Sequence, residues 1–352
     1  MNIENLFLAL SDHQASDLHL KPNAPPAMRV NGELLPLSEK VLTAQKISDL
    51  FKSMTTAAQQ AEFQENKELD FSYQLGESYR FRVNASLQMG ELGLALRRVT
   101  NQIPDLNELG LPSICRELAI NKQGLVLVTG PTGSGKSTTL ASMINYLNQT
   151  AARRIVTVED PIEYIYHDQK SYITQRELGG DTKSFATAAK QALRQDPDVI
   201  LVGEMRDPET MAACLTAAET GHLVMSTLHT NNAPQSIDRI VDSFPPHQGG
   251  QIRMQLSLSL LAILSQRLLP RIDGSGRVVV VEVLVANNAI RNLVREGKTH
   301  QMLTVMQTSS DQGMQTMDQA LQRAYQGGII SGEEALLHAS DPNKFSSLLG
   351  GI

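Results

Sequence analysis

Residues 125–137 read Leu-Val-Leu-Val-Thr-Gly-Pro-Thr-Gly-Ser-Gly-Lys-Ser, an apolar run that leads directly into a glycine-rich loop. The run has the composition of a buried strand, and the residues after Lys136 follow the pattern of a helix. In a phosphate-binding loop, glycines let successive backbone N–H groups converge on phosphate oxygens, and the next helix directs its positive end at them. The spacing of Gly130, Gly135, Lys136 and Ser137 fits such a loop. This segment therefore predicts a nucleotide site.

The loop also predicts the role of individual residues. We expect Lys136 to reach the outer phosphates and the Ser137 hydroxyl to complete a Mg²⁺ site. A flexible glycine-rich loop without a ligand is the alternative, and a strand before it and a helix after it disfavour that interpretation. The residues expected to bind the nucleotide are consecutive: Gly130, Pro131, Thr132, Gly133, Ser134, Gly135, Lys136, Ser137 and Thr138.

The segments around the loop alternate between short apolar runs and amphipathic stretches. This pattern is typical of a largely parallel sheet in an α/β fold. We expect strands at 125–129, 154–158, 199–202, 222–227 and 278–285, and helices at 137–148, 184–194, 208–219 and 234–242. Residues 1–100 alternate differently and predict a smaller α+β domain, with strands at 17–20, 68–73, 79–88 and 92–99 and helices at 43–54 and 56–65.

The predicted domain organisation follows from these patterns. An N-terminal domain covers 1–100, a linker 101–115, a nucleotide-binding core 116–285 and a helical C-terminal region 286–352. Within the last region, residues 289–296 predict a short amphipathic helix that ends at Gly297, with Ile290, Leu293 and Val294 facing inward. Met314, Met317, Leu321 and Ala324 recur at helical spacing and are expected in the core.

Composition excludes several function classes. With 41% hydrophobic residues in 352, the chain can bury a core and is not a disordered protein. A net charge of −6 and only 4% aromatic residues argue against a nucleic-acid surface. Cys115 and Cys214 alone cannot form a four-thiolate zinc site. No leader is recognised, and the longest apolar runs are interrupted by Glu282 and by residues 265–267, so we expect a soluble, cytoplasmic chain.

Acidic residues follow two of the expected strands. Ligands of open α/β sheets gather at the carboxyl ends of the strands, where Glu159, Asp160 and Glu163 are expected. These acids could orient a water or a magnesium ion, and a solvated acidic turn is the alternative. Glu204 follows the strand at 199–202, where an aspartate is usual, so we assign it to positioning or deprotonating the attacking water. The alternative is that Glu204 only pairs with Arg206.

Two histidines flank the strand at 222–227. Seven residues at about 3.3 Å each separate His222 from His229 by roughly 23 Å, so both cannot reach one phosphate. His229 follows the carboxyl end of the strand and is the candidate sensor of the terminal phosphate, whereas His222 is interpreted as structural. The same distance excludes one zinc site that uses both.

Taken together, four motifs resemble those of the secretion-type ATPases that drive type IV pili and type II secretion. In that family, 130–137 corresponds to the Walker A motif, 159–163 to the Asp box, 203–207 to an atypical Walker B motif and 220–231 to the His box. The resemblance extends over nearly the whole chain and includes 16–20. Two C-terminal segments, 289–293 and 313–321, look like those of pilus retraction motors, and the lack of a four-cysteine site favours retraction over extension.

The resemblance implies a specific motor. It implies a RecA-like P-loop ATPase core after a PAS-like N-terminal domain, ATP and Mg²⁺ as ligands, and a homohexameric ring. The implied function is ATP hydrolysis that drives type IV pilus retraction and twitching motility. The implied location is cytoplasmic and peripheral at the inner membrane. The implied partners are a pilus platform protein and, as an open alternative, a second retraction ATPase, and no nucleic acid is expected.

The family also places arginines of the N-terminal domain against the nucleotide. Arg80 and Arg82 match this pattern and share one face of a strand because they are two residues apart. Arg97 is assigned with them, and Arg98 stays an open alternative. Arginines lying over a sheet surface with no ligand are the competing interpretation.

Three further interpretations stay open. Arg291 and Arg295 form a basic stripe on the helix at 289–296, which is either a solvated face or, by the resemblance, an element needed for retraction. The whole chain could instead be a RecA-like translocase of another substrate. It could also be a low-activity accessory subunit of a pilus motor.

Overall fold

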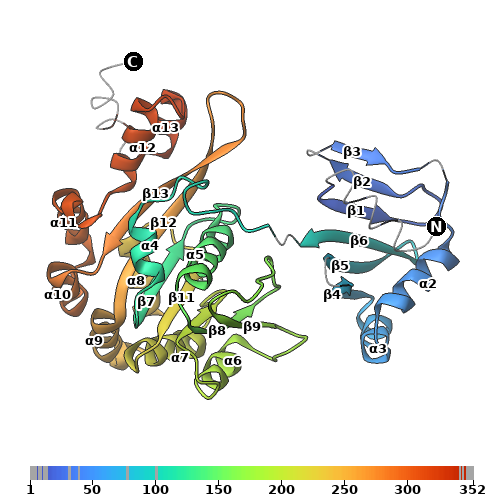
Figure 1. The fold of residues 1–352 in the computed structure, drawn as a ribbon, viewed down its shortest axis with the longest axis horizontal. Helices are drawn as coiled ribbons and strands as arrows, with labels where there is room; N and C mark the ends of the chain where they lie inside the picture. Colours follow the sequence, from blue (N-terminus) through green and yellow to red (C-terminus); the bar gives the residue numbers. More distant parts are fainter. Residues whose placement is uncertain are drawn as a thin grey trace. The chain divides into compact units, whose positions relative to one another are not determined.

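A computed structural model describes residues 15–30, 33–38, 40–76, 79–99 and 102–340, together with residues 6, 10, 342 and 345. The chain divides into two compact units, each with its own sheet (Figure 1). The first contains residues 1–102 and 161–165, and the second contains 103–160 and 166–352. The expected mixed α/β class is confirmed.

The first unit is an antiparallel sheet that packs, among the described residues, against helices α2 and α3. Its strand order among the described residues is β3-β2-β1-β6-β5-β4. Phe81, Val83 and Leu96 alternate with polar neighbours and bury one face of the sheet, as period-2 patterning requires. The helices begin at Thr43 and Thr56, whose side chains accept backbone N–H bonds at the helix starts. The elements are β1 (Asp17–Leu20), β2 (Ala27–Val30), β3 (Glu33–Pro36), α2 (Ala44–Met54), α3 (Ala57–Asn66), β4 (Glu68–Leu75), β5 (Tyr79–Gln88) and β6 (Glu91–Val99).

The second unit is built on a sheet of order β13-β12-β7-β11-β10-β8-β9 among the described residues. Every neighbouring pair is parallel except β12 with β13. Parallel strands bring their carboxyl ends to one edge, and this edge carries the candidate site. The strands are β7 (Gly124–Thr129), β8 (Arg154–Glu159), β9 (Tyr172–Glu177), β10 (Val199–Val202), β11 (Leu223–Leu228), β12 (Leu260–Pro270) and β13 (Arg277–Val285).

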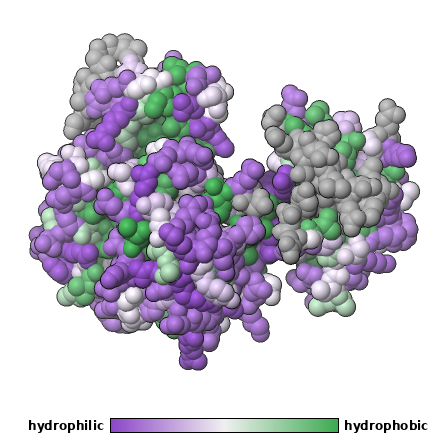
Figure 2. Space-filling view, viewed as in Figure 1, coloured by the Kyte–Doolittle hydropathy of each residue, from purple (hydrophilic) through white to green (hydrophobic). Residues whose placement is uncertain are grey.

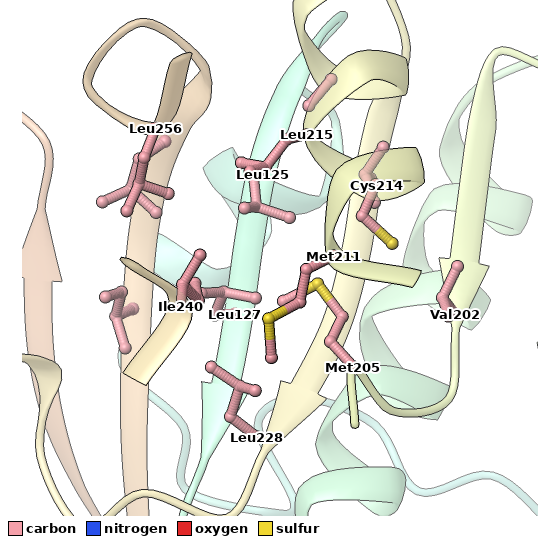
Figure 3. Close-up of a cluster of buried hydrophobic side chains, with 14 of the residues drawn as sticks. Leu125, Leu127, Val202, Met205, Met211, Cys214, Leu215, Leu228, Ile240 and Leu256 are labelled. Atoms are coloured by element: carbon pink, nitrogen blue, oxygen red, sulfur yellow. The ribbon is translucent and has the colours of Figure 1, made fainter. Parts of the chain in front are cut away.

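Helices cover both faces of this sheet. One face packs against α4 and α5, which contribute Cys115 and Ile144 to the core. The other face packs against α6 to α11, and Figure 3 shows part of this cluster, with Leu125 and Leu127 of β7 beside Met211 of α7. The helices are α4 (Ile114–Ala119), α5 (Lys136–Thr150), α6 (Phe185–Ala192), α7 (Pro208–Glu219), α8 (Ala233–Asp242), α9 (Gly249–Ser259), α10 (Asn288–Glu296) and α11 (Met302–Thr308).

The chain continues as helices after β13, as expected. Helix α10 ends at Gly297, whose φ of 68° is the left-handed conformation that glycine accommodates. Helices α12 (Met317–Gln326) and α13 (Gly332–His338) form a small cluster with Val280 of β13. The core assignment of Met314, Met317, Leu321 and Ala324 is confirmed, since all four are buried.

The main difference from the sequence-based expectation is β12. Its sequence is an interrupted apolar run with no expected strand, yet it forms an eleven-residue strand between β7 and β13. The interrupting side chains of Ser265 and Gln266 can be buried because each is hydrogen-bonded: Ser265 accepts from Thr129, and Gln266 donates to Thr139.

Candidate nucleotide-binding site

The phosphate loop starts where buried β7 ends. Gly130 has a φ of 139°, and a Cβ there would lie 2.4 Å from the Gln266 carbonyl oxygen and 2.7 Å from Ser134 Oγ. No side chain fits in that space. Gly133 and Gly135 have φ values of 80° and 88°. The glycines are therefore required by backbone conformation and, at position 130, by close contact with β12.

Lys136 folds back over its own loop. Its Nζ donates hydrogen bonds to the carbonyl oxygens of Gly130, at 2.8 Å, and Pro131, at 3.0 Å. The side chain is buried although lysine is rarely so. The ammonium group is thus held at the centre of the loop, where an entering phosphate would meet it.

The residues around the loop fit a phosphate and a metal ion. Ser134 Oγ is buried and has no hydrogen-bond partner among the described residues, so the loop presents an unsatisfied hydroxyl. Ser137 lies in the first turn of α5 and is exposed, which leaves its hydroxyl free to reach a ligand. The N-terminus of α5 follows directly and favours anions. These features suit a nucleotide phosphate, with Ser137 as the residue that would hold Mg²⁺.

Strand order brings the expected acidic and histidine residues beside the loop. The strands β7, β11, β10 and β8 are consecutive neighbours in the sheet. At their carboxyl ends lie, in the same order, the phosphate loop, His229, Glu204 and Glu159. Four segments up to 99 residues apart in sequence, from Gly130 to His229, thus converge on one edge. Glu163 is exposed and lies outside this row, in the stretch 161–165 that groups with the first unit.

Glu204 lies between a histidine and an arginine. Its Oε1 is 3.2 Å from His229 Nε2, and its Oε2 accepts a hydrogen bond of 2.8 Å from Arg206 Nε. The Glu204 side chain is only 17% exposed, against 63% for Arg206. Pairing with Arg206 is therefore present, as the alternative held, but His229 contacts the same carboxylate. The turn is fixed by Thr227 Oγ1, which donates to the Gly203 carbonyl oxygen.

Glu159 ends β8 and is held by two neighbours. Its Oε1 accepts hydrogen bonds from Thr157 Oγ1, at 2.7 Å, and from Gln175 Nε2, at 3.2 Å. The carboxylate therefore has a defined orientation at the sheet edge. His222 lies at the opposite end of β11, where its Nδ1 is 3.0 Å from the Ala217 carbonyl oxygen, in agreement with a structural role.

The expected arginines of the first unit lie on one sheet face. Arg82 and Arg97 are directly paired across β5 and β6, and Arg80 is two residues along β5 on the same face. Arg97 Nε donates to Asp17 Oδ1 at 2.8 Å. Although burial raises the pKa of Asp17, hydrogen bonds from Ser16 and Arg97 outweigh it, and the pKa is lowered. The assignment of these arginines to nucleotide sensing stays a prediction.

Sequence reasoning missed the residues of β12 that support the loop. Ser265 Oγ accepts a hydrogen bond of 2.9 Å from Thr129 Oγ1, and Gln266 Nε2 donates to Thr139 Oγ1 of α5 at 2.8 Å. β12 therefore anchors both the strand before the loop and the helix after it. Polar residues inside an apolar run were the available signal.

In the part of the chain that the structure describes, no group of three or more His, Cys, Asp or Glu side chains could hold a metal ion. Across the same residues, none of the helices combines the length and apolar character needed to span a bilayer. Both cysteines are buried, and burial raises the pKa of each thiol to about 12. On the face in Figure 2, the second unit is mostly hydrophilic with scattered hydrophobic residues.

Comparison with known proteins then identifies the family. Residues 2–337 match the model described as type II/IV secretion system protein. The chain belongs to this family. It is 44% identical over 343 residues to the type IV pilus ATPase PilU of Pseudomonas aeruginosa, covering 97% of this chain and 90% of PilU. It is also 44% identical over 345 residues to the retraction ATPase PilT of that organism, covering 98% of this chain and 100% of PilT.

A solved structure supports the same family membership. The crystal structure of the pilus retraction motor PilT with bound ADP has a TM-score of 0.91 to this chain, with 47% identity and 98% of both chains covered. The resemblance stated from the motifs is confirmed. The secretion family member described here therefore shares its fold with a nucleotide-bound motor.

Proposed function

We propose that this chain is an ATP-hydrolysing motor that drives type IV pilus retraction. The observation that carries the proposal is the row of strand ends in which the phosphate loop, His229, Glu204 and Glu159 lie in consecutive order. Pilus retraction is supported as the work that hydrolysis drives by membership of the type II/IV secretion family and by 44% identity to PilT over nearly the full chain.

The loop residues perform the binding step. The backbone N–H groups of 130–138 and the Lys136 ammonium hold the phosphates, and Lys136 exchanges its bonds to the Gly130 and Pro131 carbonyl oxygens for phosphate oxygens. Ser137 would hold Mg²⁺, which when bound neutralises charge on the phosphates.

Glu204 and its neighbours perform the hydrolytic step. Glu204 orients a water and accepts its proton while the water oxygen bonds to the γ-phosphorus and the bond to the bridging oxygen breaks, leaving ADP and phosphate. His229 holds the Glu204 carboxylate at 3.2 Å and senses the terminal phosphate. We assign Glu159 to orienting the water, and Arg80, Arg82 and Arg97 to stabilising phosphate charge. Glu163 keeps its assignment to water orientation, although it lies outside the row of strand ends.

Membership of the type II/IV secretion family supports a proposal for the assembly. We place the chain in a homohexamer on a platform protein at the cytoplasmic side of the inner membrane, where nucleotide-driven domain movements return pilins to the membrane. Size measurement of the nucleotide-bound protein by light scattering tests the hexamer directly.

Two variants test the chemistry. Lys136→Ala removes the central cation and should abolish nucleotide binding and turnover. Glu204→Gln keeps the shape of the side chain and should bind ATP but hydrolyse it roughly a hundred- to thousandfold more slowly, as expected for loss of a general base. Equal turnover by Glu204→Gln and the parent would refute the assigned role. A deletion strain of a piliated host, complemented with the parent or with Lys136→Ala, tests retraction through twitching.

A second candidate is favoured by one observation. The chain is 44% identical to PilU as well as to PilT, so identity does not separate a main motor from a second pilus ATPase. In that case the isolated chain would turn over little ATP, and twitching would need a co-expressed retraction motor. A turnover assay on the purified oligomer distinguishes the two.

A further inference from the structure

Three buried polar side chains form a row across adjacent strands of the second unit. Thr129 of β7 is paired with Ser265 of β12, and Ser265 is paired with Glu282 of β13. All three are at most 2% exposed. Thr129 Oγ1 donates to Ser265 Oγ at 2.9 Å, and directly opposed residues of neighbouring strands place their side chains on one face. The row starts at the residue that precedes Gly130.

Glu282 ends the row at the starts of two helices. Its Oε1 accepts a hydrogen bond of 2.7 Å from the backbone N–H of Ala233, the first residue of α8. The backbone N–H of Met317, the first residue of α12, also donates to this carboxylate. Helix starts leave N–H groups without intrahelical partners and carry positive partial charge, so they stabilise a buried carboxylate.

Among the described residues, two charged side chains act on Glu282, namely Asp318 and Arg267. Burial raises its pKa, the bonds from Ala233 and Met317 lower it, the charge of Asp318 raises it and that of Arg267 lowers it. Because an unpaired buried carboxyl group is costly, these two backbone donors are the reason that an acid is tolerated at this position.

The start of α8 is close in sequence to the candidate site. Ala233 follows His229 by four residues, and His229 contacts Glu204. Asn232 caps α8 by accepting a bond of 2.9 Å from the Gln235 backbone N–H. Two acceptors, Asn232 and Glu282, therefore hold the first turn of α8 from different sides. A shift of that turn would move His229 through the three intervening residues, 230–232.

We propose that Glu282 is a positioning residue for ATP hydrolysis. Its carboxylate fixes the first turn of α8 relative to α12 and to β7, the strand before the phosphate loop. It thereby holds His229 against Glu204. This inference rests on the proposed function. Glu282 does not touch the nucleotide site itself, so its effect is on the rate of the chemical step and not on nucleotide affinity.

Glu282→Gln tests this role because it keeps the shape of the side chain and removes the charge. We expect kcat to fall roughly ten- to a hundredfold, since misplacement by about 1 Å has effects of this size. KM and the Kd for ADP should stay within about twofold of the parent values, because the Thr129–Ser265 hydrogen bond beside the phosphate loop is unchanged in this variant. Hydrogen exchange of peptides covering 229–240 should become faster. Asp198→Asn is the matched control, because Asp198 also accepts a backbone N–H bond, from Arg154, but at the amino ends of the strands.

A second variant keeps the proposal testable if Glu282→Gln, which changes a buried residue, does not fold. Asn232→Ala removes an exposed cap of the same helix turn and should lower kcat selectively, by less than Glu282→Gln. Unchanged kcat in both variants relative to Asp198→Asn would overturn the inference. So would a parallel loss of ADP affinity and melting temperature in Glu282→Gln, which would indicate a purely structural role. Absence of turnover in the parent protein would instead refute the proposed function, and the positioning role with it.

Discussion

Replacing Gly130 with alanine is the strictest test of the phosphate-loop geometry. The added Cβ would lie 2.4 Å from the backbone oxygen of Gln266, in β12, and 2.7 Å from Ser134 Oγ. The backbone oxygen cannot move without shifting a central strand of the sheet. In addition, the φ of 139° is one that side chains with a Cβ rarely adopt. The substitution therefore combines a steric clash with backbone strain.

The magnitude follows from these two costs. Strained backbone costs about 1–3 kcal/mol, and overpacking a tight site costs about another 1–3 kcal/mol. If the loop keeps its shape, the total of about 2–6 kcal/mol appears as lost stability, which for a unit of this size lowers the melting temperature by at least about 4 °C. If the loop relaxes, the same free energy appears as a Kd for ADP at least roughly thirtyfold weaker.

Gly133→Ala provides the matched comparison. A Cβ at Gly133 would meet nothing within 4 Å, and its φ is 80°. Only the left-handed backbone conformation is penalised, at about 1–2 kcal/mol. Melting curves and ADP titrations of both variants, done together, should therefore rank Gly130→Ala as the more damaging. If Gly130→Ala retained both the melting temperature and the ADP affinity of the parent, the described contact between loop and β12 would be wrong.

Three further outcomes follow from the structure. Arg291→Ala should lower the free energy of unfolding by about 2–3 kcal/mol, because the guanidinium group donates to three carbonyl oxygens at the end of α9. Arg291→Lys should restore this free energy only in part, since an ammonium group lacks the planar, forked set of donors of a guanidinium. Chemical denaturation measures the stability of both variants. Because the pKa of Asp17 is lowered in the folded state, its pairing with Arg97 stabilises the first unit at pH values above the unfolded pKa of about 3.9. This stabilisation is lost as the pH falls through the folded pKa. In acid unfolding, Asp17→Asn should therefore be less stable than the parent at neutral pH, and its stability should depend less on pH. Cys115 and Cys214 should resist thiol reagents at pH 8 until the protein unfolds, because burial raises both pKa values to about 12; rapid labelling of either thiol in the folded protein would contradict this.

The sequence was sufficient where local pattern and local chemistry agree. The segment 125–137 predicted β7 and the start of α5 within one residue, because apolar runs and glycine spacing are local properties. His222 and His229 were placed at opposite ends of β11 by counting along a strand. The end of α10 at Gly297 followed from the same kind of rule, since a helix stop is set by its own residues.

Contacts set by tertiary structure were less accessible. Arg291 was left between a solvated stripe and a retraction element, and the structure shows it bonded to the end of α9, about 30 residues earlier in the chain. The contact of His229 with Glu204 depends on β10 lying beside β11, which only the strand order specifies. No local pattern contains this information.

The polar residues that interrupt apolar runs do more than exclude a membrane span: they also indicate where buried polar contacts lie. Ser265 and Glu282 lie inside strands made mostly of apolar residues, so their burial is predictable from the sequence alone. A buried carboxyl group without donors costs several kcal/mol, so burial also predicts that donors exist. The N–H groups least used by the backbone are those at helix starts, which makes them the expected partners of such a carboxylate. The class of partner is therefore predictable, whereas its identity, Ala233 at 49 residues and Met317 at 35 residues from Glu282, requires the fold.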